Sequence, residues 1–517
     1  MIGDVAAGAG LLVASAAAAY AVRGRPSRAR AVAMVVALVL APVLITGDAW
    51  DTPRFEDLRD TPARTAALLL AGLALVAGGA LLVRRRPWLL GPLVAAALPF
   101  RVPLEAGGEQ ANLLVPLYLV IAAGVIAAAT SPAWGHDGER ESPPALVWLR
   151  RALAGFVVLY ALQALYSEDA SRGLQNACFF LVPFSLAFVL LCDLRWDRRL
   201  LVACAAVAAA EAVLFAVVGL AQYATGKLLW NDEVILANEF HPYFRVNSLF
   251  WDPNVLGRYL ALVALAGAAL LLWARDLRLL LALTAGIALL LAAMAVTFSQ
   301  SSYAALLAGL AVLAALRWSA RWTAAVVAAV LVAAGIAVAL VADFSTSPKV
   351  NKDTGGRFEL IKGGAELFAD RPLWGYGSGS FSEAYVSHVE KGPALVSESH
   401  TEPVTVAAEQ GLIGLAAFVA LLAAAAWALT LRLRPVMPGL GGGTDARGPP
   451  DHVAVGRAAI IAMFVALVVH TVSYAGFFED PITWVLLAVG SALAVHHSRE
   501  RQAPAPPAGA QRSAPAA

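Results

Sequence analysis

Charged residues and cysteines are both scarce in this chain of 517 residues. Asp, Glu, Lys and Arg make up only 14% of the residues, whereas hydrophobic residues make up 60%. A soluble protein of this length needs a more polar surface, so the composition excludes that class and indicates a membrane protein. The three cysteines, Cys178, Cys192 and Cys204, lie in apolar runs without the spacing of a disulfide framework or of metal ligands.

Long apolar segments account for most of the chain. A window of about 20 residues, the length that spans a bilayer as a helix, finds about fifteen candidates. They lie near residues 5–22, 31–47, 63–83, 88–100, 113–129, 147–166, 177–193, 200–222, 255–274, 279–298, 301–316, 323–341, 408–430, 457–477 and 481–497. These runs lack the alternation of membrane strands, so we predict an all-α polytopic membrane protein with about 12–15 transmembrane helices.

The loops between these segments carry charge of alternating sign. Arginines gather in every second loop, as at Arg84 to Arg86 and Arg198 to Arg199, whereas carboxylates such as Asp48 and Glu105 occupy the loops between. The positive-inside rule places the arginine-rich loops in the cytoplasm and the others outside. We therefore predict a multi-pass protein of the bacterial cytoplasmic (inner) membrane.

Two predicted outward loops are far longer than the rest, and long loops are where functional sites tend to lie. They define a core of the chain with helices on both sides and a Pro- and Ala-rich tail, which we expect to be disordered and cytoplasmic. The predicted parts are N-terminal helices in 1–222, a core in 223–430 with loops 223–254 and 342–407, C-terminal helices in 431–497, and the tail 498–517.

The first long loop ends in PheArgValAsnSerLeuPheTrpAspProAsn, residues 244–254, and runs into a membrane helix. Asp252 before Pro253 suits a helix N-cap, and it also suits a polar site together with Asn254. Arg245 and Arg258 near the outer face run against the charge bias, so each needs an anionic partner. For Arg245, that partner is either a substrate or a lipid phosphate.

The second long loop begins with a segment whose apolar residues at 358, 361, 365 and 368 share one helical face, which predicts an amphipathic surface helix. Arg357 stands at its expected N-terminus behind two glycines, where free amides and a guanidinium could bind a diphosphate. A solvated surface arginine is the alternative.

The rest of this loop contains ProLeuTrpGlyTyrGlySerGlySerPhe, residues 372–381, and then His400. No strand precedes these glycines and no phosphate-loop lysine follows, so Gly377 and its neighbours indicate a tight turn beside the site. His400 is either a packed side chain or a catalytic base, with Glu402 and Glu409 close in sequence to orient it.

Taken in order, these segments resemble the O-antigen ligase and polymerase family over residues 240–415. The resemblance rests on the AspProAsn turn at 252–254, GlyArg at 356–357, the glycine motif at 372–381, and a His followed by GluGlnGlyLeuIleGly at 409–414. It implies a GT-C-like helical bundle that transfers a glycan from an undecaprenyl-diphosphate donor to a glycan, lipid or protein acceptor outside the cytoplasm. It also implies that neither a metal nor another cofactor takes part.

Carried over by position, the resemblance makes His400, Arg357 and Arg245 the catalytic residues, with the two arginines on the diphosphate. The substrate-binding residues that it implies are Arg258, Asp252, Asn254, Gln300, Gly377, Glu402 and Glu409. The family commonly has an arginine where this chain has Gln300, so this phosphate contact is either missing or supplied elsewhere, as by Arg258 or Lys362.

A transporter or flippase for a lipid-linked or small polar substrate is the alternative from another class. Such proteins place ionisable residues near the middle of the membrane. Here only Glu211 and His470 lie plainly inside apolar segments, whereas the other polar residues gather at the predicted outer face. The pattern therefore favours surface chemistry over passage through the membrane.

Overall fold

The computed structural model describes residues 2–50, 59–106, 109–131, 143–230, 234–236, 238, 243–321, 324, 328, 357–390, 399–431, 433 and 452–500. Within these ranges, eleven helices are long and apolar enough to cross a membrane. They are α1 (Ile2–Arg23), α2 (Arg28–Ala49), α4 (Pro62–Arg85), α7 (Pro144–Ala164), the continuous α8 to α9 (Ala170–Cys192), α10 (Arg198–Thr225), α12 (Pro253–Trp273), α13 (Leu277–Ala295), α14 (Gln300–Arg317), α19 (Glu402–Thr430) and α21 (His452–Ser473).

Shorter elements complete the described fold. Three are further apolar helices: η2 (Pro87–Leu89) running into α5 (Leu90–Ala97), α6 (Val115–Thr130) and α22 (Pro481–Glu500). The surface elements are α17 (Arg357–Asp370), α18 (Phe381–Tyr385) and the π-turn η4 (Val386–Glu390), and a second π-turn, η3 (Ala177–Leu181), joins α8 (Ala170–Asn176) to α9 (Val182–Cys192). The prediction of an all-α polytopic membrane protein is confirmed.

Two departures from the predicted elements stand out, and one predicted element remains untested. A short antiparallel hairpin, β1 (Val102–Ala106) and β2 (Glu109–Leu113), lies where the sequence suggested only a loop. The predicted span at 88–100 is a short helix of eight residues behind a 3-10 turn, because Pro87 starts a new element there. The predicted span at 323–341 lies outside the described residues except for positions 324 and 328, so it remains a prediction.

Polar side chains start several long helices at the positions where apolar runs begin. The N-cap oxygens of Asp197, Asp252, Asp276 and Ser299 each accept a backbone N–H of the first helical turn. Such caps satisfy amides that have no intrahelical partner, which matters most where water is scarce. The predicted cap at Asp252 is confirmed, with its Oδ1 accepting from the amide of Asn254 at 2.6 Å.

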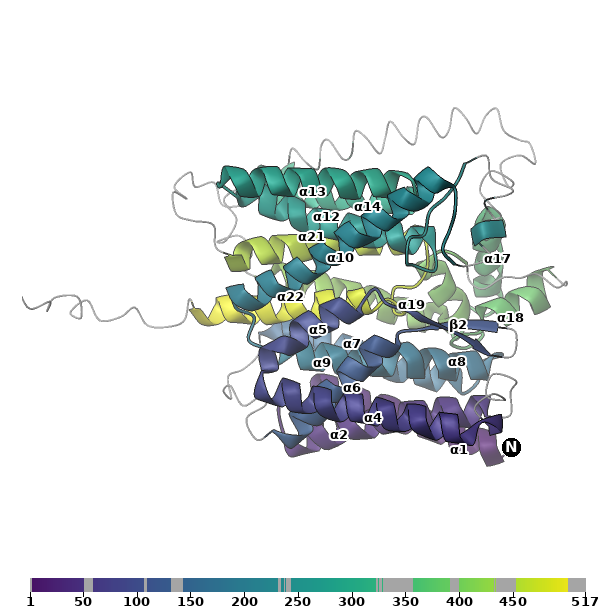
Figure 1. The fold of residues 1–517 in the computed structure, drawn as a ribbon. Coiled ribbons are helices and arrows are strands. Elements are labelled where there is room, and N and C mark those ends of the chain that lie inside the picture. Colours follow the sequence, from purple (N-terminus) through teal and green to yellow (C-terminus); the bar gives the residue numbers. More distant parts are fainter. Residues whose placement is uncertain are drawn as a thin grey trace, which may run out of the picture.

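The long helices run roughly parallel, so the loops fall at two opposite ends of the bundle (Figure 1). Elements α8, α17, α18 and the β-hairpin all lie at one end, which is the predicted outer end (Figure 1). Ser171 donates to Asp48 Oδ2 at 2.6 Å and Tyr166 donates to the carbonyl of Trp374 at 2.7 Å, which ties outward loops far apart in sequence together. The site residues predicted on different loops are therefore brought to the same end.

Small residues allow the central helices to pack closely. Gly309 of α14 lies against Leu265 of α12 and the backbone of Ala462 on α21, where a side chain would clash. In lipid, the hydrophobic effect does not drive helices together, because lipid tails are as apolar as the helix surface. Close backbone approach of this kind increases the van der Waals contacts that help to hold the helices together. These central helices, α12, α14 and α21, carry the polar residues of the candidate site on their outer ends.

Candidate functional site

Arg245 is held against the turn that joins α13 to α14. Its backbone amide donates to Asn238 Oδ1 at 2.9 Å, and the Asn238 side chain donates back to the Arg245 carbonyl at 3.0 Å. The guanidinium donates from Nε to the carbonyl of Thr297 at 2.9 Å and from Nη2 to Asn254 Oδ1 at 3.1 Å. It forms no ion pair with any carboxylate of the described residues.

A cluster of buried serines continues from this turn. Ser299 Oγ lies 3.1 Å from Ser301 Oγ and 2.8 Å from Ser302 Oγ, and Ser302 Oγ donates to the carbonyl of Asn254 at 3.4 Å. Ser301 Oγ in turn lies 3.1 Å from Nε2 of His470, which is fully buried on α21. Gln300 is exposed and is the first residue of α14, directly after this turn.

Aromatic rings link His470 to His400. The ring of Tyr474 lies 5.7 Å from the ring of His470 and 6.2 Å from that of His400, measured between centroids. His400 precedes α19 and has a left-handed backbone conformation with φ of 58°. This conformation is uncommon for residues other than glycine. Strain of this kind persists only where the surrounding structure imposes it, and it is concentrated at functional sites.

The segment Tyr474 to Asp480, between α21 and α22, ties the separate parts of the site together. Asp480 pairs with Arg258 of α12 at 2.9 Å, with both side chains buried. Glu402 Oε2 accepts the amides of Gly476 at 2.8 Å and Phe477 at 3.0 Å. The segment is therefore fixed to two predicted site residues, and its Tyr474 stands beside the third, His400.

The segment with the glycine motif, residues 372–381, is called the glycine loop. A break in α19 explains how this loop attaches to the helix. Gly411 has φ of 63° and ψ of −163°, so the carbonyls just before it lose their helical partners. The carbonyl of Glu409 instead accepts the amide of Gly377 at 2.7 Å, and the amide of Leu412 donates to the carbonyl of Pro372 at 2.7 Å. The Glu409 carboxylate accepts the amides of Gly379 at 2.8 Å and Phe381 at 3.1 Å.

Ionic contacts fasten the outer surface of the same loop. Glu168 pairs with Arg371 at 3.2 Å and with His388 at 3.2 Å, while the Arg371 guanidinium lies 4.2 Å from the ring centre of Tyr376. Burial and its hydrogen bond to Asp370 raise the pKa of Tyr376 to about 12. Tyr376 therefore remains a neutral donor, and this half-exposed cluster serves to hold the loop on the corner of α7 and α8.

Residues 285–419 match the family model described as O-antigen ligase. The chain carries an O-antigen ligase domain. The match covers the end of α13, all of α14, α17 and α18, and the first part of α19, so it includes Gln300, Arg357, Gly377 and His400. None of the curated proteins compared with the chain matches it.

The O-antigen ligase domain, set among these membrane helices, supports a membrane glycosyltransferase-like role of the ligase or polymerase type in polysaccharide biosynthesis. Arg245, Asp252, Asn254 and Arg258 lie before the matched residues. The fold nevertheless places them beside the domain, because Arg245 binds the turn before α14 and Asn254 contacts Ser302.

The predicted site residues divide into two groups in the structure. Arg245, Asn254 and Gln300 surround one turn, while Glu402 and Glu409 anchor the loops on either side of α19. α17 begins at Arg357, which confirms the predicted surface helix, but the Arg357 side chain lies outside the described residues. Their roles toward substrate remain predictions.

Sequence reasoning missed Tyr474, Glu479 and Asp480. They stand in a short loop, TyrAlaGlyPhePheGluAspPro at 474–481, whose length gave no reason to expect a site. The sequence contained one signal for this site: two adjacent carboxylates, Glu479 and Asp480, directly before a proline at the predicted outer end of an apolar span. Only the fold shows that this loop lies between α12 and α19, where Asp480 meets Arg258 and Gly476 meets Glu402.

Proposed function

We propose that the protein transfers or polymerises a glycan from an undecaprenyl-diphosphate donor onto an acceptor hydroxyl at the external face of the bacterial inner membrane. The O-antigen ligase domain supports the reaction class, and the predicted outer end of the bundle is where the polar residues gather. In this reaction the bond between the sugar and the diphosphate breaks, the acceptor oxygen bonds to the sugar, and undecaprenyl diphosphate leaves with the electron pair.

The observation that carries this proposal is the continuous set of hydrogen-bond and ring contacts that joins Arg245 to His400. It runs from the guanidinium through Asn254 and the serines to His470, and then by ring contacts through Tyr474. A cation for the leaving group and an imidazole for the acceptor proton are thus held in one rigid frame. Preorganised groups of this kind stabilise developing charge without reorganising during the reaction.

Arg245 suits the diphosphate better than the other candidate cations. Arg258 is buried and its charge is balanced by Asp480, and Lys362 is an exposed surface residue that pairs with Glu366 at 3.7 Å. Arg245 stands over the very turn where the family commonly has an arginine and this chain has Gln300. In our proposal Arg245 and Arg357 neutralise the diphosphate, so the reaction requires no metal ion.

His400 takes the proton of the acceptor hydroxyl in this proposal. It lies just before α19, beside the ring of Tyr474, at the predicted outer end of a membrane helix, where a soluble acceptor and a lipid-linked donor could both reach it. The substrate-binding residues of this proposal are Arg258, Asp252, Asn254, Gln300, Gly377, Glu402 and Glu409.

The test is the surface glycan profile of a deletion strain complemented with wild type, His400→Ala or His452→Ala. His452 is an exposed histidine at the opposite end of the bundle, so it serves as the matched control. Wild type and His452→Ala should restore the polymer and His400→Ala should not. Loss of whole chains from an acceptor indicates a ligase, and collapse to single repeat units indicates a polymerase. An unchanged profile in the deletion strain favours the transporter or flippase alternative.

A further inference from the structure

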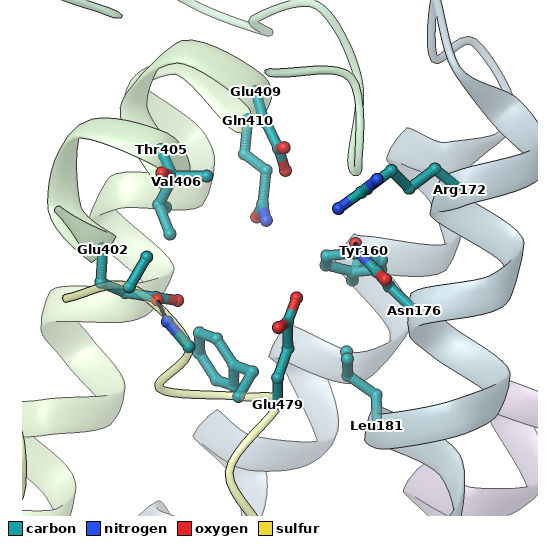
Figure 2. Close-up of a pocket in the computed structure, with 13 residues that line it drawn as sticks. Tyr160, Arg172, Asn176, Leu181, Glu402, Thr405, Val406, Glu409, Gln410 and Glu479 are labelled. Carbon is teal, nitrogen blue, oxygen red and sulfur yellow. Dashed lines mark hydrogen bonds between the residues drawn. The ribbon is translucent and has the colours of Figure 1, made fainter. Parts of the chain in front are cut away.

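A small enclosed cavity lies behind the site, between α7 and α8 on one side and α19 on the other, with the segment Tyr474 to Asp480 closing it (Figure 2). Its volume is about 50 Å³, enough for one or two water-sized groups. The polar side chains that line it come from every wall: Tyr160, Arg172, Asn176, Glu402, Thr405, Glu409, Gln410 and Glu479.

Two of the three carboxylates have hydrogen-bond partners in the backbone. Glu402 accepts two amides of the segment Tyr474 to Asp480, and Glu409 accepts two amides of the glycine loop. These bonds provide both carboxylates with hydrogen-bond donors from the protein itself. Neither carboxylate therefore needs a further donor in the cavity.

Glu479 and Gln410 differ, because their side chains face the cavity (Figure 2) and no backbone amide of the described residues donates to their oxygens. Gln410 is only 2% exposed, and within the described part of the chain its Oε1 has no hydrogen-bond partner. Leaving a buried amide oxygen unpaired costs about 1–3 kcal/mol, so native structures normally supply a partner. Two acceptors directed into one cavity require a ligand that is cationic or donates hydrogen bonds.

The charge of the cavity favours a cation over water alone. Three carboxylates and one guanidinium line it, which leaves a formal surplus of two negative charges. Arg172 is an exposed residue whose guanidinium points into the cavity from the α8 side (Figure 2), where it offsets one of the three carboxylates. Buried charges normally have a counterion or take up a proton, and a cation bound in the cavity would supply the counterion.

We propose that this cavity is a binding site for one small monovalent cationic group, held by the Glu479 carboxylate and the Gln410 side-chain carbonyl. Oxygen ligands of this type suit hard cations and ammonium groups. Within the described part of the chain no three His, Cys, Asp or Glu side chains are arranged to hold a metal ion, which argues for a monovalent group rather than a multivalent metal. The group is either a free ion such as Na⁺ or the amine of an amino sugar.

Binding would also have a structural consequence. Glu479 belongs to the same short loop as Tyr474, whose ring stands beside His400, and as Asp480, which pairs with Arg258. A cation that neutralises Glu479 would stabilise this loop in the position that supports His400. If the source is an amino sugar, the inference rests on the proposed function; if it is a free ion, it does not.

The experiment measures the apparent melting temperature of the full-length protein in detergent, in choline chloride or in an equal concentration of NaCl, KCl or methylammonium chloride. Choline holds the ionic strength constant and is too large for the cavity. We expect a saturable rise of about 1–3 °C with at least one small cation, because a ligand that binds only the folded state stabilises it. The rise should be lost in Glu479→Gln and Gln410→Leu and kept in Glu211→Gln, which removes a carboxylate elsewhere.

The different salts distinguish a free ion from the amine of an amino sugar as the ligand. A response to NaCl or KCl indicates a free ion, whereas a response to methylammonium and to glucosamine, but not to glucose or to the alkali ions, indicates a sugar amine. Equal melting temperatures for wild type in all the salts overturn the inference, as does an unchanged response in both Glu479→Gln and Gln410→Leu. Because no transfer is measured, this failure is distinct from failure of the proposed glycosyltransferase activity.

Discussion

Arg245 shows at the scale of one residue how the fold prepares a cation for an anionic ligand. Its amide, carbonyl and two guanidinium nitrogens are all held by neighbouring residues, yet within the described residues no carboxylate neutralises it. A guanidinium positioned in this way can still direct its remaining N–H groups at phosphate oxygens. Geometry and charge together distinguish it from Arg258, whose charge is balanced by Asp480.

Replacing Arg245 should therefore abolish transfer. We expect Arg245→Ala to lower the rate by at least about 100-fold, in line with removal of one group that stabilises transition-state charge. Arg245→Lys should recover only part of the rate, because lysine cannot contact both Thr297 and Asn254 as the planar guanidinium does. Transfer is measured in membranes matched for protein level; full activity of Arg245→Ala would remove this residue from the site.

Glu479 provides a pH-dependent prediction at the same scale. Burial raises the pKa of Glu479 above its ordinary value of 4.5, with the charge of Arg172 opposing the rise. The folded state therefore binds a proton more tightly than the unfolded state, so stability should fall as pH increases through the range above 4.5. In choline buffer the melting temperature of wild type should fall more than that of Glu479→Gln between about pH 4.5 and pH 8. Parallel curves would show that Glu479 does not titrate in this way.

Individual residues differ in how far the sequence revealed them. The cap at Asp252 could be predicted from the local sequence alone, because an aspartate before a proline at the start of an apolar run accepts backbone amides only two and three residues further along. The partners of Glu402 and Arg258 lie more than seventy residues further along the chain. Such contacts depend on tertiary packing and leave no local pattern, which is why Asp480 and Tyr474 were missed.

At the scale of elements, the break in α19 is the feature on which the glycine loop depends. A continuous helix would keep the carbonyls of Ala408 and Glu409 in its own ladder. The left-handed residue Gly411 releases them, and they accept the amides of Tyr376 at 3.2 Å and Gly377 at 2.7 Å. The hydrogen bonds between α19 and the loop thus exist because one residue leaves the helical conformation.

Gly411→Ala should disrupt this arrangement. A Cβ at position 411 would lie 2.6 Å from the backbone nitrogen of Trp374, and φ of 63° is itself unfavourable for alanine. We expect a loss of about 1–3 kcal/mol in stability together with reduced transfer. Thermal unfolding in detergent measures the first effect.

Gly286→Ala is the matched control, because this glycine lies within α13 with nothing within 4 Å of an added Cβ. Removing a glycine from a helix interior should raise stability by about 0.5–1 kcal/mol. If Gly411→Ala behaves like this control, the backbone break is not needed for the loop.

Most elements were predictable because membrane helices follow from composition and length. Apolar runs long enough to cross the bilayer must form helices, so their existence was clear, as was the surface helix α17. The β-hairpin at 102–113 and the early start of α19 at Glu402 were not predicted. Both lie at the predicted outer end, where polar contacts rather than hydrophobicity fix the backbone.

At the scale of the whole molecule, the account depends on which end of the bundle faces outward. The structure gathers α8, α17, α18 and the hairpin at one end (Figure 1), and the distribution of arginines predicts that this end is external. The family match and the apolar helices support a multi-pass membrane protein, and its orientation is open to direct measurement.

Single cysteines at exposed positions of the two ends test the orientation. Glu383→Cys on α18 should react with a membrane-impermeant maleimide in intact cells, whereas Arg278→Cys at the start of α13 should react only after lysis. The parent chain, whose three cysteines are buried or half-buried, gives the background. The reverse pattern would place the candidate site in the cytoplasm.

The most direct test of the central claim is glycan transfer by the purified protein in liposomes that contain an undecaprenyl-diphosphate-linked oligosaccharide. Candidate acceptors are added with and without EDTA, and release of undecaprenyl diphosphate is measured together with the size of the glycan product. The account predicts that wild type releases the carrier and lengthens or transfers the glycan in the presence of EDTA, and that His400→Ala lowers the rate by about 100-fold or more. Equal rates for wild type and His400→Ala, or complete loss of transfer with EDTA, would contradict it.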